Sequence, residues 1–516
     1  MKKSELKPFP PPIPLKKIFG PSFIILALGL GSGEVILWPY LTANFGLGIA
    51  WGALLGITFQ FFINMEIERY ALIKGESVFV GIDKVFSWAA YWFIISTFIG
   101  FGLPGIIAAA AQIFAFILGV ENFKWLAVAF LVLIGVILSV GKTVYGLMEK
   151  ITKTVIFAGI PLIVVLAAML TSGSDWLELG KGLLGRGRDY NFLPIGISLA
   201  TFFAAFAYSG AGGNLNLTQS IYIKEKGYGM GQYSQKISGL FKNLKERQKI
   251  DLAGKTFELN DENIKNFQAW WKKINLEHLL IFWLLGLLGM AVLMILAFTT
   301  AFGLKNNVSG INFVINEGMV IGQELLPLIG TLFLLVVSVM LFQTQLGILD
   351  STSRIMAENL ALKKIKGIDR QASSAHFFRS KLSGINPFLA PRLGNKKFLT
   401  FCFSRSTSPI KNLNDPKKQI NLSKIYFSFL WAQIAFGIVL FLFNIYEPQS
   451  LIILGALINA FAMFVHIGLV NWTNHRLLPK VFRPNWRRRL IIIIIFLFFG
   501  AFSALTLWDL VLKKIF

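Results

Sequence analysis

Hydrophobic residues along the chain fall into eleven long stretches rich in Leu, Ile, Phe, Val, Ala and Gly, separated by polar or basic segments. Each stretch is long enough to cross the hydrocarbon core of a bilayer, about 30 Å thick, as an α-helix. Repeated stretches of this length are typical of a polytopic membrane protein. The sequence therefore predicts an all-α fold with eleven transmembrane helices, near residues 20–45, 49–68, 88–118, 123–140, 151–170, 191–223, 278–303, 324–349, 424–445, 448–470 and 489–512.

The composition excludes several other classes of protein. Of the 516 residues, 55% are hydrophobic and 15% are charged, whereas soluble domains carry roughly 25% charged residues. The single cysteine, Cys402, excludes an intrachain disulfide and a thiolate metal cluster. No Ser/His/Asp, HExxH, Walker-type or paired CxxC arrangement occurs. The sequence therefore predicts neither an enzyme nor a resident cofactor.

The distribution of basic residues predicts the orientation. If the N-terminus lies inside, 43 of the 50 Lys and Arg residues fall in segments that face the cytoplasm and 7 in segments that face outward. Cytoplasmic loops of membrane proteins are enriched in Lys and Arg. We therefore expect a protein of the plasma membrane (the inner membrane of a bacterium or archaeon) with a cytoplasmic N-terminus and an external C-terminus. These basic loops also account for the net charge of +24 without a nucleic-acid partner.

The predicted spans divide the chain into successive parts. Two long segments between spans, 224–277 and 351–423, are expected to be cytoplasmic. Each is predicted to be a helical hairpin or an irregular linker at the membrane surface, and a regulatory or lipid-binding role stays open. The expected order is a cytoplasmic tail (1–19), transmembrane helices 1–5 (20–170), an external loop (171–190), transmembrane helices 6–10 with the two long loops (191–470), and a loop with transmembrane helix 11 (471–516).

Glycine clusters interrupt the first and sixth spans, as GLGSGE at 29–34 and SGAGGN at 209–214. Each glycine costs a helix about 0.5–1 kcal/mol relative to alanine, and unwound backbone at membrane depth is tolerated only where it lines a cavity. The two breaks are five spans apart, and an odd repeat reverses direction across the membrane. Spans 1–5 and 6–10 are therefore predicted to be inverted repeats with a substrate site between the breaks. The glycines of GLPGIIAAAA in span 3 are predicted only to permit close packing.

Glu34 accompanies the first break. A charged side chain at the centre of a transmembrane helix costs about 2.5–3.5 kcal/mol on insertion scales and marks a functional site by default. Unwound backbone beside it would offer free carbonyl oxygens, which are natural ligands of hard cations. The alternative that we retain is a carboxylate that only maintains packing.

The segment GPSFIILALGLGSGEVILWPYLTANFG and the later SGAGGNLNLTQSIYI resemble the Nramp metal-ion transporter family. The resemblance is closer to the divergent Nramp-related branch that includes magnesium transporters. It covers residues 20 to about 512, with the long loops poorly matched. It implies a LeuT-type fold of two inverted five-helix repeats, in which broken helices 1 and 6 hold the ion between them.

The resemblance also implies a set of metal-site residues. The family's Asp-Pro-Gly-Asn motif in the first helix is replaced here by GSGE, and its Met-Pro-His motif in the sixth helix by AGG. The backbone carbonyl before the second motif would come from Tyr208, and Asn459 in span 10 would add an oxygen. The implied metal site therefore consists of Glu34, Gly31, Tyr208, Ala211, Asn214 and Asn459.

The departures from the family pattern shape the functional hypothesis. Ala211 replaces a thioether that would favour softer ions, and oxygen-only ligands suit magnesium, calcium and manganese. Gly31 replaces the family's aspartate, which leaves Glu34 to supply the charge. The third span carries no Asp, Glu, Arg or His, and Gly213 replaces the family's histidine, so tight proton coupling is not expected.

The resulting hypothesis is a transporter of divalent metal cations, with Mg²⁺ or Mn²⁺ favoured, that works by alternating access. We expect the metal ion as its substrate, the lipid bilayer around it, and a monomeric chain. One alternative keeps the fold but changes the substrate to amino acids or another small organic solute, coupled to sodium ions or protons. Another is a membrane-embedded enzyme or an inactive structural protein.

Polar residues at the end of the second span leave two interpretations open. Glu66, Glu68 and Arg69 would form either a gate ion pair or a solvated helix end. His466 in span 10 would be either a proton- or metal-binding group or a hydrogen-bonded packing residue.

Overall fold

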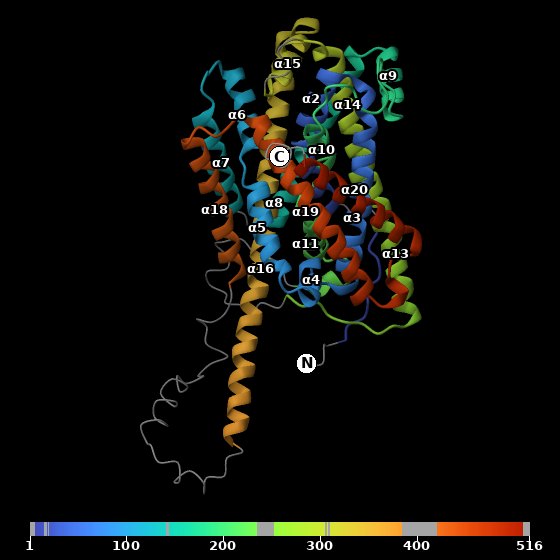
Figure 1. Cartoon of the computed structure of the whole chain (residues 1–516), viewed down its shortest axis with the longest axis vertical. Helices are drawn as coiled ribbons and strands as arrows, with labels where there is room; N and C mark the ends of the chain where they lie inside the picture. The colour runs from blue at the N-terminus through green and yellow to red at the C-terminus, as the bar shows by residue number, and fades with distance from the viewer. Residues whose placement is uncertain are drawn as a thin grey trace.

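The structure is a computed structural model of a helical membrane protein (Figure 1). Among the residues described, extended backbone pairs only in two isolated bridges, Leu6 with Thr256 and Arg186 with Asn191. The model describes residues 6–14, 18, 20–140, 144–234, 252–304, 307, 310–383 and 421–508. Cys402 and parts of both long loops, 235–251 and 384–420, lie outside these ranges.

The predicted all-α, polytopic fold class is confirmed. In the described part of the chain, nine helices are long and apolar enough to cross a membrane, and Lys124–Val140 is a shorter apolar helix. The predicted sixth span is divided between two nine-residue helices and so does not count among the nine. The number of eleven transmembrane helices therefore stays a prediction.

The first half of the chain begins with the two parts of the broken first span and ends with a short helix after the fifth span. Its elements are α1 (Pro21–Gly29), the π-helical turn η2 (Gly33–Leu37), α2 (Trp38–Phe45), η3 (Leu47–Ile49), α3 (Ala50–Lys74), α4 (Val78–Val85), α5 (Ala89–Phe101), α6 (Gly105–Leu118), α7 (Lys124–Val140), α8 (Val144–Leu170) and α9 (Gly173–Leu183).

The second half begins with the sixth span and ends with the last long helix. Its elements are α10 (Leu199–Ala207), η4 (Gly213–Leu217), α11 (Thr218–Lys226), η5 (Gly229–Tyr233), α13 (Asp261–His278), the π-helical turn η6 (Leu279–Leu284), α14 (Leu285–Ala301), α15 (Asn312–Glu324), α16 (Pro327–Ser383), α18 (Leu422–Leu442), α19 (Pro448–Leu477), η10 (Lys480–Phe482) and α20 (Trp486–Leu507).

The two predicted helix breaks are present, and they meet. Between α1 and η2 the chain turns over residues 30–32, and between α10 and η4 it unwinds over residues 208–212. A methyl group on Gly33 would overlap the carbonyl oxygen of Tyr208, and one on Gly29 would overlap the backbone of Gly210. Gly210 itself has a φ of 112°, which side chains other than hydrogen rarely tolerate. Glycine is therefore required here both for the turn and for the close approach.

The third span is also interrupted, which the sequence analysis did not predict. Helix α5 ends at Phe101, and α6 begins at Gly105 after Pro104. Proline has no backbone N–H, and its ring clashes with the carbonyl four residues earlier, here that of Gly100. The glycines that we interpreted as packing residues therefore border a third break.

The N-terminal segment defines one side of the bundle, which we call the tail side. Its extended backbone lies along α13: the Phe9 amide donates to Asn263 Oδ1 (3.0 Å) and the Trp270 indole donates to the Pro10 carbonyl (3.0 Å). Figure 1 shows this segment at one end of the bundle, with α9 and α15 at the opposite end. The buried face of α13, which includes Phe267, Trp270 and Ile274, explains why this stretch of the expected loop 224–277 is a helix that continues into η6 and α14.

Two other segments are helical where hydropathy predicts a loop. Helix α16 continues through Ser383, so the first part of the expected loop 351–423 prolongs the eighth span (Figure 1). Its residues 350–359 are buried, and Arg354 pairs there with Asp350 (2.9 Å) and Glu225 (2.5 Å). In the expected external loop 171–190, a capping box at Ser172 and Asp175 starts α9. Buried ion pairs therefore accompany the continuation of α16, and a polar cap starts the separate helix α9, in regions where hydropathy alone predicts loops.

The contact between the breaks predicts a large effect of Gly33→Ala. The added methyl group would push the Tyr208 carbonyl away, and we expect a loss of unfolding free energy of about 1–3 kcal/mol from this overpacking. Thermal unfolding of the purified protein measures it. Gly180→Ala is the matched control, since a methyl group there meets no atom within 4 Å and favours helix α9. Equal stability of the two variants would contradict the contact.

Candidate functional site

Glu34 lies where the two breaks meet, in the first turn of η2. Its side chain is fully buried (0% exposed), and neither carboxylate oxygen has a hydrogen-bond partner in the described part of the chain. Its own backbone N–H and that of Gly210 in the second break act electrostatically on the carboxylate without meeting the geometry of a hydrogen bond. Burying an ionised carboxylate without full hydrogen bonding is costly, so either a proton or a bound cation would have to offset its charge.

Tyr208 presents its carbonyl oxygen to the same place. The oxygen lies against Gly33, next to Glu34 in sequence, because Tyr208 is the first residue after α10 and its carbonyl is released from the helix. Gln60 in α3 secures the neighbouring unwound backbone: its Nε2 donates to the Ala207 carbonyl (2.9 Å), and its Oε1 accepts from the Gly212 amide (3.0 Å). The two breaks thus bring a carboxylate and a backbone carbonyl together.

Asn459 of α19 is held by two hydrogen bonds. Its Nδ2 donates to the carbonyl of Gly100 (3.0 Å), which Pro104 excludes from the helix, and to the Tyr208 hydroxyl (2.9 Å). Its Oδ1 is buried without a partner among the described residues and lies against Gly213. Asn459 therefore links the third break to the sixth-span break and leaves one oxygen free.

The remaining predicted site residues lie around this centre. Ala211 is buried in the sixth-span break and contributes no polar side-chain atom. Gly31 lies against the side chain of Thr344 in α16 rather than against Tyr208. Asn214 is turned toward α5, where its Nδ2 donates to Ser96 (2.8 Å) and Thr97 (3.0 Å) and its Oδ1 has no described partner.

The candidate site therefore offers oxygen atoms only. Among the predicted site residues, the unpaired side-chain atoms are the carboxylate oxygens of Glu34 and the amide oxygens of Asn214 and Asn459, and the Tyr208 carbonyl lies beside Gly33. No group of three His, Cys, Asp or Glu residues suited to a metal ion occurs in the ranges that the structure describes. Such a donor set suits a hard cation that keeps part of its water shell.

Sequence reasoning missed a polar stripe on α3. Gln60, Asn64 and Glu68 are spaced four residues apart, and all three are completely buried. Residues at this spacing share one face of a helix. The segment QFFINMEIE carried this signal, but its acidic end was interpreted separately from Gln60 and Asn64.

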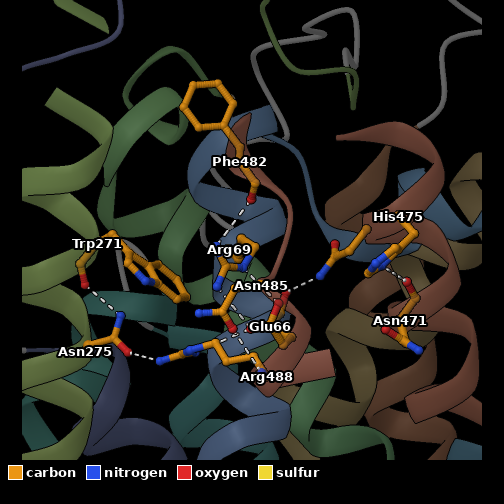
Figure 2. Close-up of polar contacts among 10 residues, drawn as sticks. Glu66, Arg69, Trp271, Asn275, Asn471, His475, Phe482, Asn485 and Arg488 are labelled. Atoms are coloured by element: carbon orange, nitrogen blue, oxygen red, sulfur yellow. Dashed lines mark hydrogen bonds and ion pairs between the residues drawn. The ribbon is translucent and has the colours of Figure 1, made fainter. Parts of the chain in front are cut away.

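Glu66 and Arg69 form an ion pair on another face of α3, and the interpretation as a solvated helix end was wrong. Arg69 Nε lies 2.8 Å from Glu66 Oε2, both side chains are buried, and the guanidinium lies 4.0 Å from the ring centre of Trp271. Arg488 of α20 adds a contact of 3.3 Å to Glu66 and one of 2.6 Å to Asn275 (Figure 2). This cluster joins α3, α13 and α20 on the tail side.

Comparison with solved structures identifies the fold. Two variants of the manganese transporter of Eremococcus coleocola each align with a TM-score of 0.50 and 12% identity, over 96% of this chain and 94% of theirs. The chain has the LeuT-type fold. MhsT in complex with L-phenylalanine aligns less well, with a TM-score of 0.41 and 15% identity over 92% of this chain and 97% of that one. No family model and no curated protein matches the sequence. At these identities the likeness concerns the fold alone.

The hydrogen bonds of Asn459 predict energetic coupling to Tyr208. Asn459→Leu removes the donor to two buried groups, and we expect the free energy of unfolding to fall by about 1–3 kcal/mol. Tyr208→Phe should cost less in the Asn459→Leu background than in the wild type, because their shared bond is already lost. Chemical unfolding of the four proteins measures this.

The control for this cycle is Asn471→Leu, at a partly exposed position of the same helix, where we expect a change of about 0.5 kcal/mol or less. Strictly additive effects of the Asn459 and Tyr208 substitutions would contradict the bond between them.

Proposed function

We propose that this protein transports divalent metal cations across the membrane by alternating access, with Mg²⁺ or Mn²⁺ as its substrate. The observation that carries the proposal is Glu34, a fully buried carboxylate without a hydrogen-bond partner in the described chain, at the contact between two broken helices. Paired breaks of this kind mark the midplane substrate site of secondary transporters.

The electrostatics of the site favour a cation. A charged side chain in mid-membrane costs about 2.5–3.5 kcal/mol on insertion scales, and a bound cation would offset that cost. The Tyr208 carbonyl beside Gly33 directs the negative end of a dipole toward the same region. Glu34 would thus supply the charge and the unwound backbone the neutral oxygens.

The choice of ion follows from the donor atoms. The side chains of Gly31 and Ala211 contain no ligand atom. Among the predicted site residues, the unpaired side-chain oxygens belong to Glu34, Asn214 and Asn459. Hard oxygen donors with few charges suit Mg²⁺ or Mn²⁺ that retains water. A hollow of about 10 Å³ beside Tyr208 and Gly455 is about the size of one water molecule.

A protein that transports a divalent metal ion shares this fold, so the fold is compatible with the proposed class of substrate. The Eremococcus coleocola protein is a manganese transporter. We further propose that the chain acts as a monomer in a plasma membrane, the inner membrane of a bacterium or archaeon. Its tail side would face the cytoplasm, because the basic residues of the sequence concentrate there.

The alternative substrate, an amino acid or another small organic solute, is less well supported by the contacts. Such a carrier would direct free N–H groups of the broken helices at a substrate carboxylate. Here the N–H of Gly210 acts electrostatically on the carboxylate of Glu34 instead. The protein's own acid thus takes the place that the substrate's acid would need.

Glu34→Gln tests the proposal directly. The substitution keeps the shape of the side chain but removes the charge that balances the cation. We expect binding and flux of Mg²⁺ and Mn²⁺ to fall by at least about tenfold, equivalent to about 1.4 kcal/mol. Calorimetric binding and vesicle flux measure this, with L-amino acids as the second class of ligand.

The matched control is Glu317→Gln, another fully buried glutamate with an unpaired oxygen, located in α15. It should bind the ions as the wild type does. Unchanged metal binding by a monodisperse Glu34→Gln protein would contradict the metal site, and retained binding of an amino acid by that variant would favour the alternative.

Ala211→Met tests the selectivity. A thioether at this buried position would add a soft ligand, so we expect the ratio of Cd²⁺ to Mn²⁺ flux to rise. Competition of the two ions in the same vesicles gives the ratio independently of the total activity. Efficient Cd²⁺ transport by the wild type would contradict an oxygen-only site.

A further inference from the structure

A second group of buried ionisable side chains lies toward the tail side of Glu34, on different residues. Ser22 of α1 donates to Glu277 Oε2 and lies 2.8 Å from His278 Nδ1. His278 Nδ1 is also 3.2 Å from Glu68 Oε1 in α3. Glu68, His278, Ser22 and Glu277 therefore form a continuous chain of polar contacts, which we call the inner chain.

The inner chain is buried and incompletely paired. Glu68, Ser22 and His278 are 0% exposed, and Glu277 is 2% exposed. Glu68 Oε2, Glu277 Oε1 and His278 Nε2 have no hydrogen-bond partner in the described part of the chain. Packing alone would not require two carboxylates here, since burying ionised groups without full pairing is costly.

An amide aligned with the inner chain is unsatisfied as well. Asn64 lies one helical turn from Glu68 on the same face of α3, is 0% exposed, and has no described partner for either Nδ2 or Oδ1. On the facing element, Gln219 Nε2 donates to Glu68 Oε1 (2.6 Å), but its Oε1 is unpaired. Hydrogen-bonding atoms of Asn64 and Gln219 beside the two acids therefore have no described partner.

The charges around the inner chain do not neutralise it. Lys153 of α8 acts on Glu277, but it is also 2.7 Å from Glu149. On the segment after α11, burial and, to a smaller extent, the negative charges of Glu277, Glu149 and Glu68 raise the pKa of Tyr228. On the remaining side, the His278 ring stacks on Phe282 (4.6 Å between ring centres) and is 5.5 Å from Phe61, which are both apolar.

The contact geometry favours a proton over a metal ion. If Ser22 donates its hydroxyl proton to Glu277, then His278 Nδ1–H is the donor that remains for Ser22 and Glu68. The members already touch at hydrogen-bond distances, so no gap for a metal ion separates them. Within the described ranges, no three His, Cys, Asp or Glu residues are arranged to hold a metal.

We infer that the inner chain is a proton-binding site: Glu68 and Glu277 share an exchangeable proton through His278 and Ser22. When the proton is bound, one carboxyl group is neutral and the contacts to Ser22 hold the tail-side end of α1 in place. When the proton leaves, both carboxylates are charged in a buried site, and their repulsion favours displacement of α1. The inner chain shares no residue with the proposed metal site at Glu34, so the two proposals can fail separately.

Infrared difference spectroscopy of the purified protein between acid and alkaline pH, without added metal, tests the inference. The wild type should show a carboxylic C=O band that disappears as the pH rises, with a carboxylate band in its place. In Glu68→Gln and in Glu277→Gln the midpoint of this band should shift to lower pH, because the remaining carboxyl group no longer faces a second carboxylate, and the double variant should lack the band. Glu34→Gln and Glu317→Gln should keep it, so a failure of the proposed metal site leaves this result unaffected.

Hydrogen exchange of residues 21–29 gives the second readout. In the wild type, exchange of α1 corrected for its intrinsic pH dependence should accelerate severalfold above the midpoint of the band, while exchange of α7 should not. In Glu68→Gln the acceleration should be absent. Ser22→Ala, a mild change in case the acid variants do not fold, should keep the band but uncouple it from α1.

Two results would overturn the inference. One is a spectrum in which the double variant Glu68→Gln/Glu277→Gln loses no titrating C=O band of the wild type, or a band whose midpoint neither single variant shifts. The other is binding of one Mn²⁺ that Glu68→Gln abolishes and Glu34→Gln leaves intact, since the inner chain would then be a metal site.

Discussion

The contact between the two broken helices is the constraint on which the rest of the structure depends. Backbone groups inside a membrane must be satisfied internally, because lipid offers no hydrogen bonds. The breaks between α1 and η2 and between α10 and η4 leave backbone N–H and C=O groups without partners in their own helix. Neighbouring elements can form hydrogen bonds with these groups only if they lie close to the breaks. Gly33 permits the Tyr208 carbonyl to reach the first break, and Gln60 of α3 donates to the Ala207 carbonyl and accepts from Gly212. The same requirement that makes these breaks costly therefore also determines their partners, and Glu34 is the one acid between them in the described part of the chain.

Much of the fold could be predicted because membrane helices leave a strong one-dimensional signal. Hydropathy located the long helices, and the glycine clusters at 29–34 and 209–214 located both breaks. The break before Pro104 was missed, since a single proline in an apolar run is compatible with a kink that neighbouring helices satisfy. The ends of α13 and α16 were also missed, because they depend on contacts between distant segments, such as Trp270 with Pro10 and Arg354 with Glu225.

The candidate site was less accessible to sequence reasoning than the fold. Glu34 was identifiable as a lone acid in an apolar span, and the structure places it, fully buried, where the two breaks meet, while its role stays a proposal. The direction in which a side chain points was not identifiable: Asn214 is turned toward Ser96 and Thr97, and Gly31 faces Thr344. The partners of Glu68, Gln219 in α11 and His278 in α13, lie 151 or more residues away in sequence, so no local pattern joins them.

Two elements connect the Glu34 site with the inner chain. Helix α1 carries Ser22, and the turn at residues 30–32 leads directly from α1 to Glu34. Helix α3 carries Gln60 beside the second break and, on the same face, Asn64 and Glu68. A displacement of α1 would move Ser22 away from Glu277 and alter the turn next to Glu34 at the same time. The protonation of the inner chain and the geometry of the Glu34 site would then both depend on the position of α1. A ligand that binds one position of α1 more tightly than the other would therefore shift the occupancy of both sites.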